Sequence, residues 1–336
     1  MIEKKRCIEI LESIKNVNVG IIGDFCVDIY WNADMTKSEL SCETPHYPLP
    51  VVAERVYPGA AGNTAANMAA LAPKSVKGLS LIGDDWRGML LKSELEKRDI
   101  DTSRFVLTPG RFTNAYCKPM RKGISAAEYE DPRLDFANYS RISKDIEEQV
   151  IAALENLAGE VDIIAVSDQF EHGIATDAVV QKIISLAKGG AKITADSRYK
   201  IDAYTNVIIK PNEVESWRAV YNNEGYLNAT EGEFIKAAVE LSKRNSAPVM
   251  LTLGSRGSVV VEGEKTTRVE AEKLAGPRDI CGAGDTFLSA FTCALGTGAT
   301  AVEAAEIAAI ASTVTVQKIG VTGTATAEEI VRQEYK

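Results

Sequence analysis

A glycine-rich stretch near the carboxyl end of the chain, DICGAGDTF at residues 279–287, combines bare backbone with carboxylates. Gly282 and Gly284 allow backbone conformations that turn several N–H groups towards one point, and a helix beginning there adds its positive end. This pattern predicts an anion hole. Asp285 could cap the helix, which alone is the better interpretation, or it could take a proton from a hydroxyl held beside the anion.

A second polar stretch, IIKPNEVE at 208–215, directly follows an apolar run. Asn212 and Glu215 are oxygen donors of the kind that a hard cation bound to phosphates recruits together with water. Lys210 in the same stretch is a candidate nucleotide contact. The structural alternative is a turn followed by a helix N-cap.

A third stretch, MLTLGSRGSVVV at 250–261, places Thr252 beside a Gly-x-x-Gly turn formed by Gly254 and Gly257. By itself this pattern is also typical of a β-hairpin. All three stretches follow predicted strands, however, and ligands of open α/β sheets bind at the carboxyl ends of the strands.

The elements around these stretches alternate between strands and helices, which predicts a mostly parallel sheet covered on both faces. Stretches at 28–57 and 104–140 are interrupted by proline and rich in aromatic residues, and they are expected to form strands of a small sheet and no helix. We therefore expect one α/β domain over 1–336 with an inserted β lid at about 26–57 and 104–137. The expected strands are 17–25, 161–168, 191–198, 206–212, 247–254 and 257–263, and the expected helices are 60–72, 143–158, 174–188, 213–220, 231–245 and two alanine-rich helices separated by a turn at 296–298.

Composition narrows the class of protein. The 336 residues carry a formal charge of -9 with no dense basic stretch, which argues against nucleic-acid binding. The six cysteines form no CxxC pair and there are only two histidines, so a zinc site is not expected. No run of about 20 apolar residues suggests a membrane span, and no signal peptide is visible, so we expect a cytoplasmic protein.

The order of these motifs resembles the ribokinase/PfkB carbohydrate kinase family over about residues 18–322. The matching segments are GDFCVD, GAAGNTAAN, KPNEVE, TLGSRG and DICGAGD. The resemblance implies a ribokinase-like α/β fold, ATP and Mg²⁺ as cosubstrate and cofactor, possible use of K⁺, and a homodimer formed through the β lid. It agrees with phosphoryl transfer, which needs an anion hole, a cation and a base near the acceptor.

The resemblance also implies a role for each matching residue. Asp285 is similar to the catalytic base, with the amides of Gly282, Ala283 and Gly284 as the anion hole. Asn212 and Glu215 resemble the pair that organises Mg²⁺ through water, and Asp279 with the turn near Gly320 resembles a monovalent-cation site. The nucleotide side comprises Lys210, Asn212, Thr252, Gly254 and Gly257, and the sugar side comprises Asp28, Gly59 and Asn63.

The acceptor side is most similar to the heptose-phosphate kinase branch, through GDFCVDIYW, RLDFAN and VSDQFEHG. Arg133 and Asp135 would then contact the substrate, and Lys118 and Arg121 could meet a phosphate on it. Ala60 stands where the family usually has the second glycine of a pair. The heptose-phosphate kinase pattern also differs from this chain at four further positions, Ala137, Asn138, Gln169 and His172. These departures leave kinases for fructose, ribose, keto-deoxy sugars or nucleosides as alternatives, together with a non-catalytic sugar- or nucleotide-sensing relative.

Overall fold

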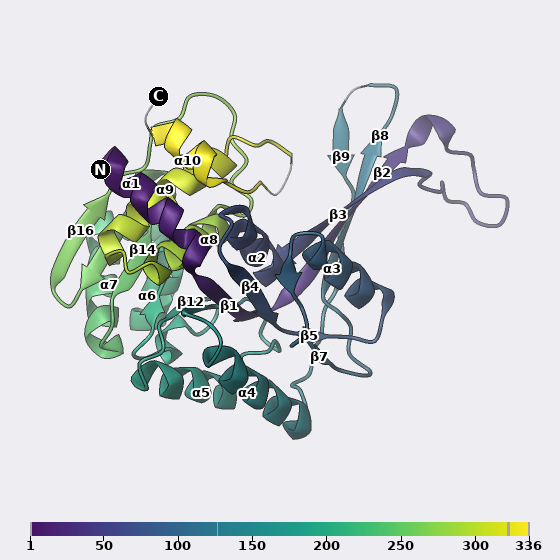
Figure 1. Ribbon diagram of the computed structural model, residues 1–336. Coiled ribbons are helices and arrows are strands. Elements are labelled where there is room, and N and C mark those ends of the chain that lie inside the picture. Colours follow the sequence, from purple (N-terminus) through teal and green to yellow (C-terminus); the bar gives the residue numbers. More distant parts are fainter. Residues whose placement is uncertain (1, 126, 321–322, 335–336) are drawn as a thin grey trace.

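Two sheets of different size organise the protein (Figure 1). The structure is a computed structural model that describes residues 2–125, 127–320 and 323–334. Within these residues, a nine-stranded sheet forms the body and a five-stranded sheet projects from it. The predicted α/β architecture with a small additional sheet is therefore confirmed.

The large sheet is parallel except at one edge, where the last two strands run antiparallel. This follows from the chain pattern, because strands joined through helices are parallel and the closing hairpins are not. The final strand of the sheet was not predicted from the sequence. In order across the sheet, the strands are β16 (Lys265–Val269), β15 (Ser258–Glu262), β14 (Val249–Thr252), β13 (Ile208–Ile209), β12 (Ile193–Ser197), β11 (Ile163–Asp168), β1 (Asn18–Gly23), β4 (Ser75–Leu79) and β6 (Ile100–Asp101).

Apolar side chains on both faces of this sheet are buried beneath helices. In β1, Val19 and Ile21 join one core and Ile22 joins the other, as the two-residue period of a strand requires. One face is covered by α1 (Lys4–Ser13), α2 (Ala61–Ala70), α8 (Ala283–Gly296), α9 (Ala301–Thr315) and α10 (Ala327–Glu334), and the other by α4 (Lys144–Ala158), α5 (Asp177–Lys188), α6 (Glu213–Tyr221) and α7 (Glu231–Asn245).

Polar caps set where several of these helices begin. α4 begins one residue after the predicted start because Ser143 caps it, accepting the N–H of Ile146 at 3.4 Å. α5 begins three residues after its predicted start at 174, because Thr176 caps it and accepts the N–H of Val179 at 3.3 Å. α7 matches its predicted range, whereas α10 was not predicted.

The small sheet consists of segments from the two predicted lid regions, with β2 paired to β3 on one side and to β8 on the other. Contrary to the expectation of no helix there, Met35–Lys37 form a 3-10 turn, because Asp34 accepts the N–H of Thr36 at 3.0 Å. α3 (Trp86–Glu96) packs near β2 and β3, and β5 (Leu81–Ile82) pairs with β7 (Val106–Leu107). The five strands are β10 (Leu134–Phe136), β8 (Ala115–Lys122), β2 (Phe25–Asp34), β3 (Val51–Ala60) and β9 (Glu128–Glu130), which pairs with β8.

Two short connections join the small sheet to the body. Asp24 is the single residue between β1 and β2, and Ala60 ends β3 directly before α2. The backbone N–H of Ala61 donates to the carbonyl of Asp24 at 3.1 Å, which holds the two connections together.

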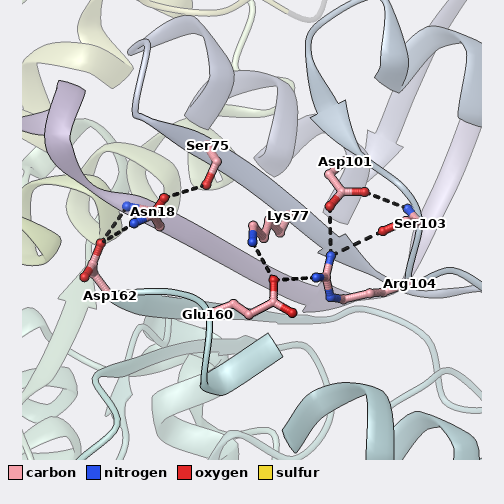
Figure 2. Close-up of polar contacts among 8 residues, drawn as sticks. All are labelled: Asn18, Ser75, Lys77, Asp101, Ser103, Arg104, Glu160 and Asp162. Atoms are coloured by element: carbon pink, nitrogen blue, oxygen red, sulfur yellow. Dashed lines mark hydrogen bonds and ion pairs between the residues drawn. The ribbon is translucent and has the colours of Figure 1, made fainter. Parts of the chain in front are cut away.

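A polar network lies where β1, β4 and β11 begin, at the opposite ends of these strands from the predicted ligand site (Figure 2). The backbone N–H of Asn18 donates to Asp162 at 2.7 Å, and Glu160 pairs with both Lys77 and Arg104 at 2.5 Å. This network links the first residues of these strands. Because it lies away from the predicted ligand site, substitutions in it can serve as controls for substitutions in the site.

Among the described residues, no helix has the length and apolar character that crossing a membrane requires.

Candidate active site

α8 begins at Ala283, directly after the N-cap residue Gly282, so a helix begins in the glycine-rich stretch as predicted. Gly282 has a φ of 77° and a ψ of 2°, the left-handed conformation that glycine adopts at little cost. It closes a turn in which the N–H of Ala283 donates to the carbonyl of Ile280 at 3.2 Å. The amide of Ala283, which the sequence placed in the anion hole, is therefore bonded to the backbone, and the other first-turn amides, including that of Gly284, are better placed to bind an anion.

The carboxylate of Asp285 lies against α2. Asn63 Nδ2 donates to Asp285 Oδ2 at 2.7 Å, and Thr64 Oγ1 donates to Oδ1 at 3.3 Å. Loss of solvent raises the pKa of Asp285 to about 6; Asp196 adds to the rise, and the bond from Asn63 and the charge of Lys210 oppose it. A carboxylate with this pKa is mostly ionised at neutral pH and still basic enough to accept a proton.

Asn63 was predicted to bind a sugar hydroxyl. In the structure it is buried, its amide nitrogen donates to Asp285, and its side-chain oxygen accepts from Asn67 Nδ2 at 3.1 Å. Contact with an acceptor stays a prediction, and the structure adds that Asn63 orients the carboxylate of Asp285.

Lys210 is a buried cation between β12 and the first turn of α8. Its Nζ lies 3.1 Å from Asp196 Oδ2, and a methyl group built on Gly284 would lie 4.0 Å from that same Nζ. Burial lowers the pKa of Lys210, but the charges of Asp196, Glu215 and Asp285 outweigh it, so the pKa is raised overall and the side chain is charged. The start of α8 is therefore flanked by a fixed positive charge.

Asn212 and Glu215 meet at the start of α6. Asn212 Oδ1 accepts the N–H of Glu215 at 2.9 Å, and Glu215 Oε2 accepts the N–H of Asn212 at 2.8 Å, which is a capping box. Burial, with the nearby charge of Asp196, raises the pKa of Glu215 to about 7. The structural alternative is thus correct for both residues, and each still presents an oxygen-bearing side chain at the edge of the site.

The predicted Gly-x-x-Gly turn joins β14 to β15. Gly254 and Gly257 have φ values of 58° and 86°, and a side chain on Gly257 would lie 2.2 Å from the carbonyl of Val269. Thr252 forms a parallel bridge with Asn212, and its N–H donates to the carbonyl of Pro211 at 3.0 Å. The two motifs predicted for the nucleotide side therefore lie next to each other.

Asp28 faces Gly59 and Lys118 in the small sheet. Asp28 Oδ1 lies 3.6 Å from Lys118 Nζ, and this buried oxygen has no hydrogen-bond partner among the described residues. A side chain on Gly59 would approach Asp28 Oδ2 to 3.0 Å and Cys26 Sγ to 2.7 Å. Burial raises the pKa of Asp28, opposed first by the charge of Lys118. An unpaired buried oxygen is suited to accept a hydrogen bond from a ligand hydroxyl.

The register of the small sheet places Asp135 opposite Tyr116, and Tyr116 opposite Asp28. Arg133 forms a two-pronged ion pair with Asp135 at 2.6 and 2.7 Å and stacks 4.2 Å from the Tyr116 ring centre. Four of the predicted substrate residues therefore form one polar row together with Tyr116, which was not predicted. We call this the acceptor row: Asp28, Tyr116, Lys118, Arg133 and Asp135.

Arg121 does not belong to this row. It is three residues from Lys118 along β8, so its side chain points to the opposite face of the sheet. Its guanidinium pairs with Asp131 at 3.1 Å. The prediction that Arg121 meets a substrate phosphate is therefore wrong, because alternation along the strand turns it away.

Cys281 is an exposed residue in the turn that precedes α8. Burial raises the pKa of this thiol, the charge of Lys118 opposes the rise, and the charges of Asp279, Asp28 and Asp285 add to it.

Asp279 and Gly320 come together as predicted for a monovalent-cation site. The carboxylate of Asp279 accepts the N–H of Cys281 at 3.0 Å and the N–H of Gly320 at 3.1 Å, while Arg55 Nη1 lies 3.4 Å from the Gly320 carbonyl oxygen. Over the described ranges, no cluster of three or more His, Cys, Asp or Glu residues could hold a metal ion.

Sequence reasoning did not assign roles to three residues that the structure brings to this region. Asp196 pairs with Lys210, Thr64 contacts Asp285, and Asp24 organises the segment after β11. Asp24 and Asp196 could have been noted as acids at the ends of apolar runs, whereas no signal in the sequence distinguishes Thr64.

The chain is similar to known proteins along most of its length. Residues 26–328 match the pfkB family of carbohydrate kinases. Bifunctional proteins HldE from Nitratiruptor sp. and Aliarcobacter butzleri are 27% and 29% identical to this chain, over 94% and 95% of it. The chain spans only 64% and 65% of the length of these two relatives.

Solved structures show the same fold. A ribokinase from Arabidopsis thaliana, solved with ribose and ATP, superposes with a TM-score of 0.69 over 96% of this chain and 100% of that chain, at 20% identity. Phosphofructokinase-2 from Escherichia coli, solved with fructose-6-phosphate, gives a TM-score of 0.71 over 94% and 97%, at 19% identity. The chain has the ribokinase-like α/β fold and belongs to the pfkB family of carbohydrate kinases.

Proposed function

We propose that this kinase transfers the γ-phosphoryl group of ATP to a hydroxyl group of a sugar or sugar phosphate in the cytoplasm, with Asp285 as the general base. The observation that carries the proposal is the position of Asp285. Its carboxylate is held by Asn63 and Thr64 in the first turn of α8, close to the buried charge of Lys210.

In the proposed reaction, the acceptor hydroxyl gives its proton to Asp285 while its oxygen bonds to the γ-phosphorus of ATP. The bond between that phosphorus and the bridging oxygen breaks, and ADP leaves. First-turn amides of α8 and the ammonium group of Lys210 stabilise the negative charge of the transferring group. The proton acceptor and the anion hole thus lie within one helical turn.

The residues on the nucleotide side fit a magnesium ion held mainly by phosphate oxygens and water. The capping box uses Asn212 Oδ1 and Glu215 Oε2, which leaves Glu215 Oε1 and the Asn212 carboxamide N–H₂ outside it, and the described residues offer no closed cluster of acidic ligands. Asn212 and Glu215 would hold the hydrated ion from the protein side, and Thr252, Gly254 and Gly257 would line the nucleotide. When bound, Mg²⁺ would neutralise charge on the phosphates. Potassium at the turn of Asp279 and Gly320 belongs to the same proposal.

The acceptor we favour is a phosphorylated sugar similar to a heptose phosphate. The acceptor row supplies two cations, Lys118 and Arg133, for an anionic group. Asp28 Oδ1 forms a 3.6 Å ion pair with Lys118 but has no hydrogen-bond partner among the described residues, so it can accept a hydrogen bond from a hydroxyl. The relatives named HldE support this class. A kinase for fructose, ribose, a keto-deoxy sugar or a nucleoside is the alternative.

The small sheet is proposed to act as a lid and as the surface of a homodimer. Its edge strand β3 exposes Val51 and Val52, and Tyr129 and Leu134 are exposed on β9 and β10. Apolar residues on an open sheet edge favour pairing with a second copy. Sedimentation equilibrium tests this, and a monomer at micromolar concentration would contradict it.

A panel of acceptors tests the function. Protein with ATP, Mg²⁺ and K⁺ is incubated separately with heptose phosphates, fructose, ribose, keto-deoxy sugars and nucleosides, and the gain of one phosphoryl group is detected by mass spectrometry. We expect transfer to a sugar phosphate that Asp285→Asn slows about 100-fold or more and that Glu160→Gln, in the distant network of Figure 2, leaves unchanged. Binding of sugars without any transfer would favour the sensing alternative.

A further inference from the structure

Asp24 uses its buried carboxylate to hold one short segment of backbone. Its Oδ2 accepts the N–H groups of Gln169 at 2.9 Å and Phe170 at 2.8 Å, and its Oδ1 accepts the N–H of Ile174 at 2.8 Å. Burial and the nearby charge of Asp168 raise the pKa of Asp24 to about 7, and the three bonds from backbone amides oppose this rise because they favour the ionised form. Three bonds to one carboxyl group are a directional set. The segment 169–174 is therefore fixed to the connection between β1 and β2.

Close packing makes this arrangement specific to the residues present. A side chain on Gly173 would lie 2.1 Å from Asp24 Oδ1, so only glycine allows the segment to wrap around the carboxylate. On its other side, Arg111 Nη2 donates to the carbonyl of His172 at 2.7 Å. The segment is thus held by Asp24 through its amides and by Arg111 through a carbonyl.

The segment reaches the acceptor row through Phe170. The Phe170 ring packs edge-on against Tyr116, with ring centres 6.3 Å apart. Tyr116 lies between Asp28 and Asp135 in the register of the small sheet and is covered on its face by Arg133. The position of Phe170 therefore sets the position of the central aromatic residue of the row.

Asp24 also occupies the connection through which the small sheet joins the body. Its backbone N–H donates to the carbonyl of Ser167 at 3.0 Å, and its carbonyl accepts the N–H of Ala61. One residue therefore contacts the end of β11, the start of α2 and the segment 169–174. None of these contacts involves the nucleotide side or the carboxylate of Asp285.

We propose that Asp24 is a positioning residue for the acceptor: by holding the segment 169–174 it places Phe170 against Tyr116 and so sets the shape of the acceptor row. The consequence is selective. Loss of the Asp24 carboxylate weakens acceptor binding and leaves ATP binding and the phosphoryl-transfer step nearly unchanged. This inference rests on the proposed function only in that the acceptor row binds the sugar.

The test compares Asp24→Asn with wild type. An asparagine places an N–H₂ group where three donors converge, so at least one backbone amide loses its partner. We expect faster hydrogen–deuterium exchange confined to 169–174, a KM for the acceptor raised at least 10-fold, and kcat and the KM for ATP within about 3-fold of wild type. Phe170→Ala should reproduce the change in KM without the change in exchange, and Phe170→Tyr should restore it. Asp101→Asn, in the network of Figure 2, is the matched control and should change neither.

The exchange measurement and calorimetric binding of the acceptor need no catalysis, so they test Asp24 even if the panel shows no phosphoryl transfer. If Asp24→Asn folds poorly, Phe170→Ala carries the comparison of acceptor affinity by itself. An unchanged acceptor affinity in Phe170→Ala, or an equal loss of kcat and of both KM values in a folded Asp24→Asn, would overturn the proposal.

Discussion

Asn63 Nδ2 lies 2.7 Å from Asp285 Oδ2, so a buried amide of α2 holds the carboxylate at the start of α8. The bond favours the ionised form of Asp285 and therefore lowers its pKa. Burial has the larger effect and acts in the opposite direction, so the pKa of Asp285 is raised overall to about 6. If Asp285 is the base, this balance sets the pH at which the kinase becomes active.

The first prediction concerns the acidic limb of the pH–rate profile. In wild type, kcat/KM should rise with pH through about 6 and level off above it, because the base must be ionised. Asn63→Ala removes a bond that favours the ionised form, so the limb should move up by about 1 pH unit. Thr64→Val, which removes the longer bond of 3.3 Å, should shift it less. An unchanged limb in Asn63→Ala would show that Asp285 does not control the profile.

The second prediction concerns strain at Ala60, where glycine is usual in the family resembled. Ala60 has a φ of 49° and a ψ of -124°, a conformation that a side chain disfavours. Ala60→Gly should raise the free energy of unfolding by about 1 kcal/mol, measured by urea denaturation. Ala53→Gly in the same strand is the control, and it should destabilise, because glycine there adds only flexibility to the unfolded chain. Equal destabilisation by both would rule out strain at Ala60.

The third prediction concerns the exposed thiol of Cys281, which lies in the turn that precedes α8. A carbamidomethyl group there would add bulk beside the first turn of α8, so iodoacetamide should abolish activity. Because the pKa of the thiol is raised, the reaction should be slow at neutral pH and accelerate as the pH rises. ATP with acceptor should protect, and Cys281→Ser should resist inactivation. If Cys42→Ser, which lacks the other exposed cysteine, resisted inactivation by iodoacetamide equally well, the inactivation could not be assigned to Cys281.

Much of the fold could be predicted because its signals are local. The helix at 231–245 follows from apolar spacing and an N-terminal Thr230–Glu233 capping pair. By contrast, the face that Arg121 occupies depends on the strand register, in which a shift of one residue reverses every side chain. Helix α10 was missed although its eight residues are amphipathic, and strand β16 was missed because four of its five residues are polar.

The candidate site was predictable as a set of motifs but not as a set of contacts. The sequence associated Asp285, Asn212 and Thr252 through the family resemblance. In the structure, Thr252 ends β14 and Asn212 lies just after β13, whereas Asp285 lies in the first turn of α8. The sequence could not show that Asn63 bonds to Asp285, because these residues are more than 200 positions apart and meet only through the packing of α2 on α8. The role of Asp24 was hidden for the same reason.

The most direct test of the account is the turnover of Asp285→Asn with the acceptor that wild type phosphorylates. Asparagine preserves the size of the side chain and can still accept the bond from Asn63, so acceptor and ATP dissociation constants should stay within about 3-fold of wild type. Because the amide is not a base at neutral pH, kcat should fall about 100-fold or more. A variant that binds both substrates and turns over at nearly the wild-type rate would contradict the assignment of Asp285 as the general base.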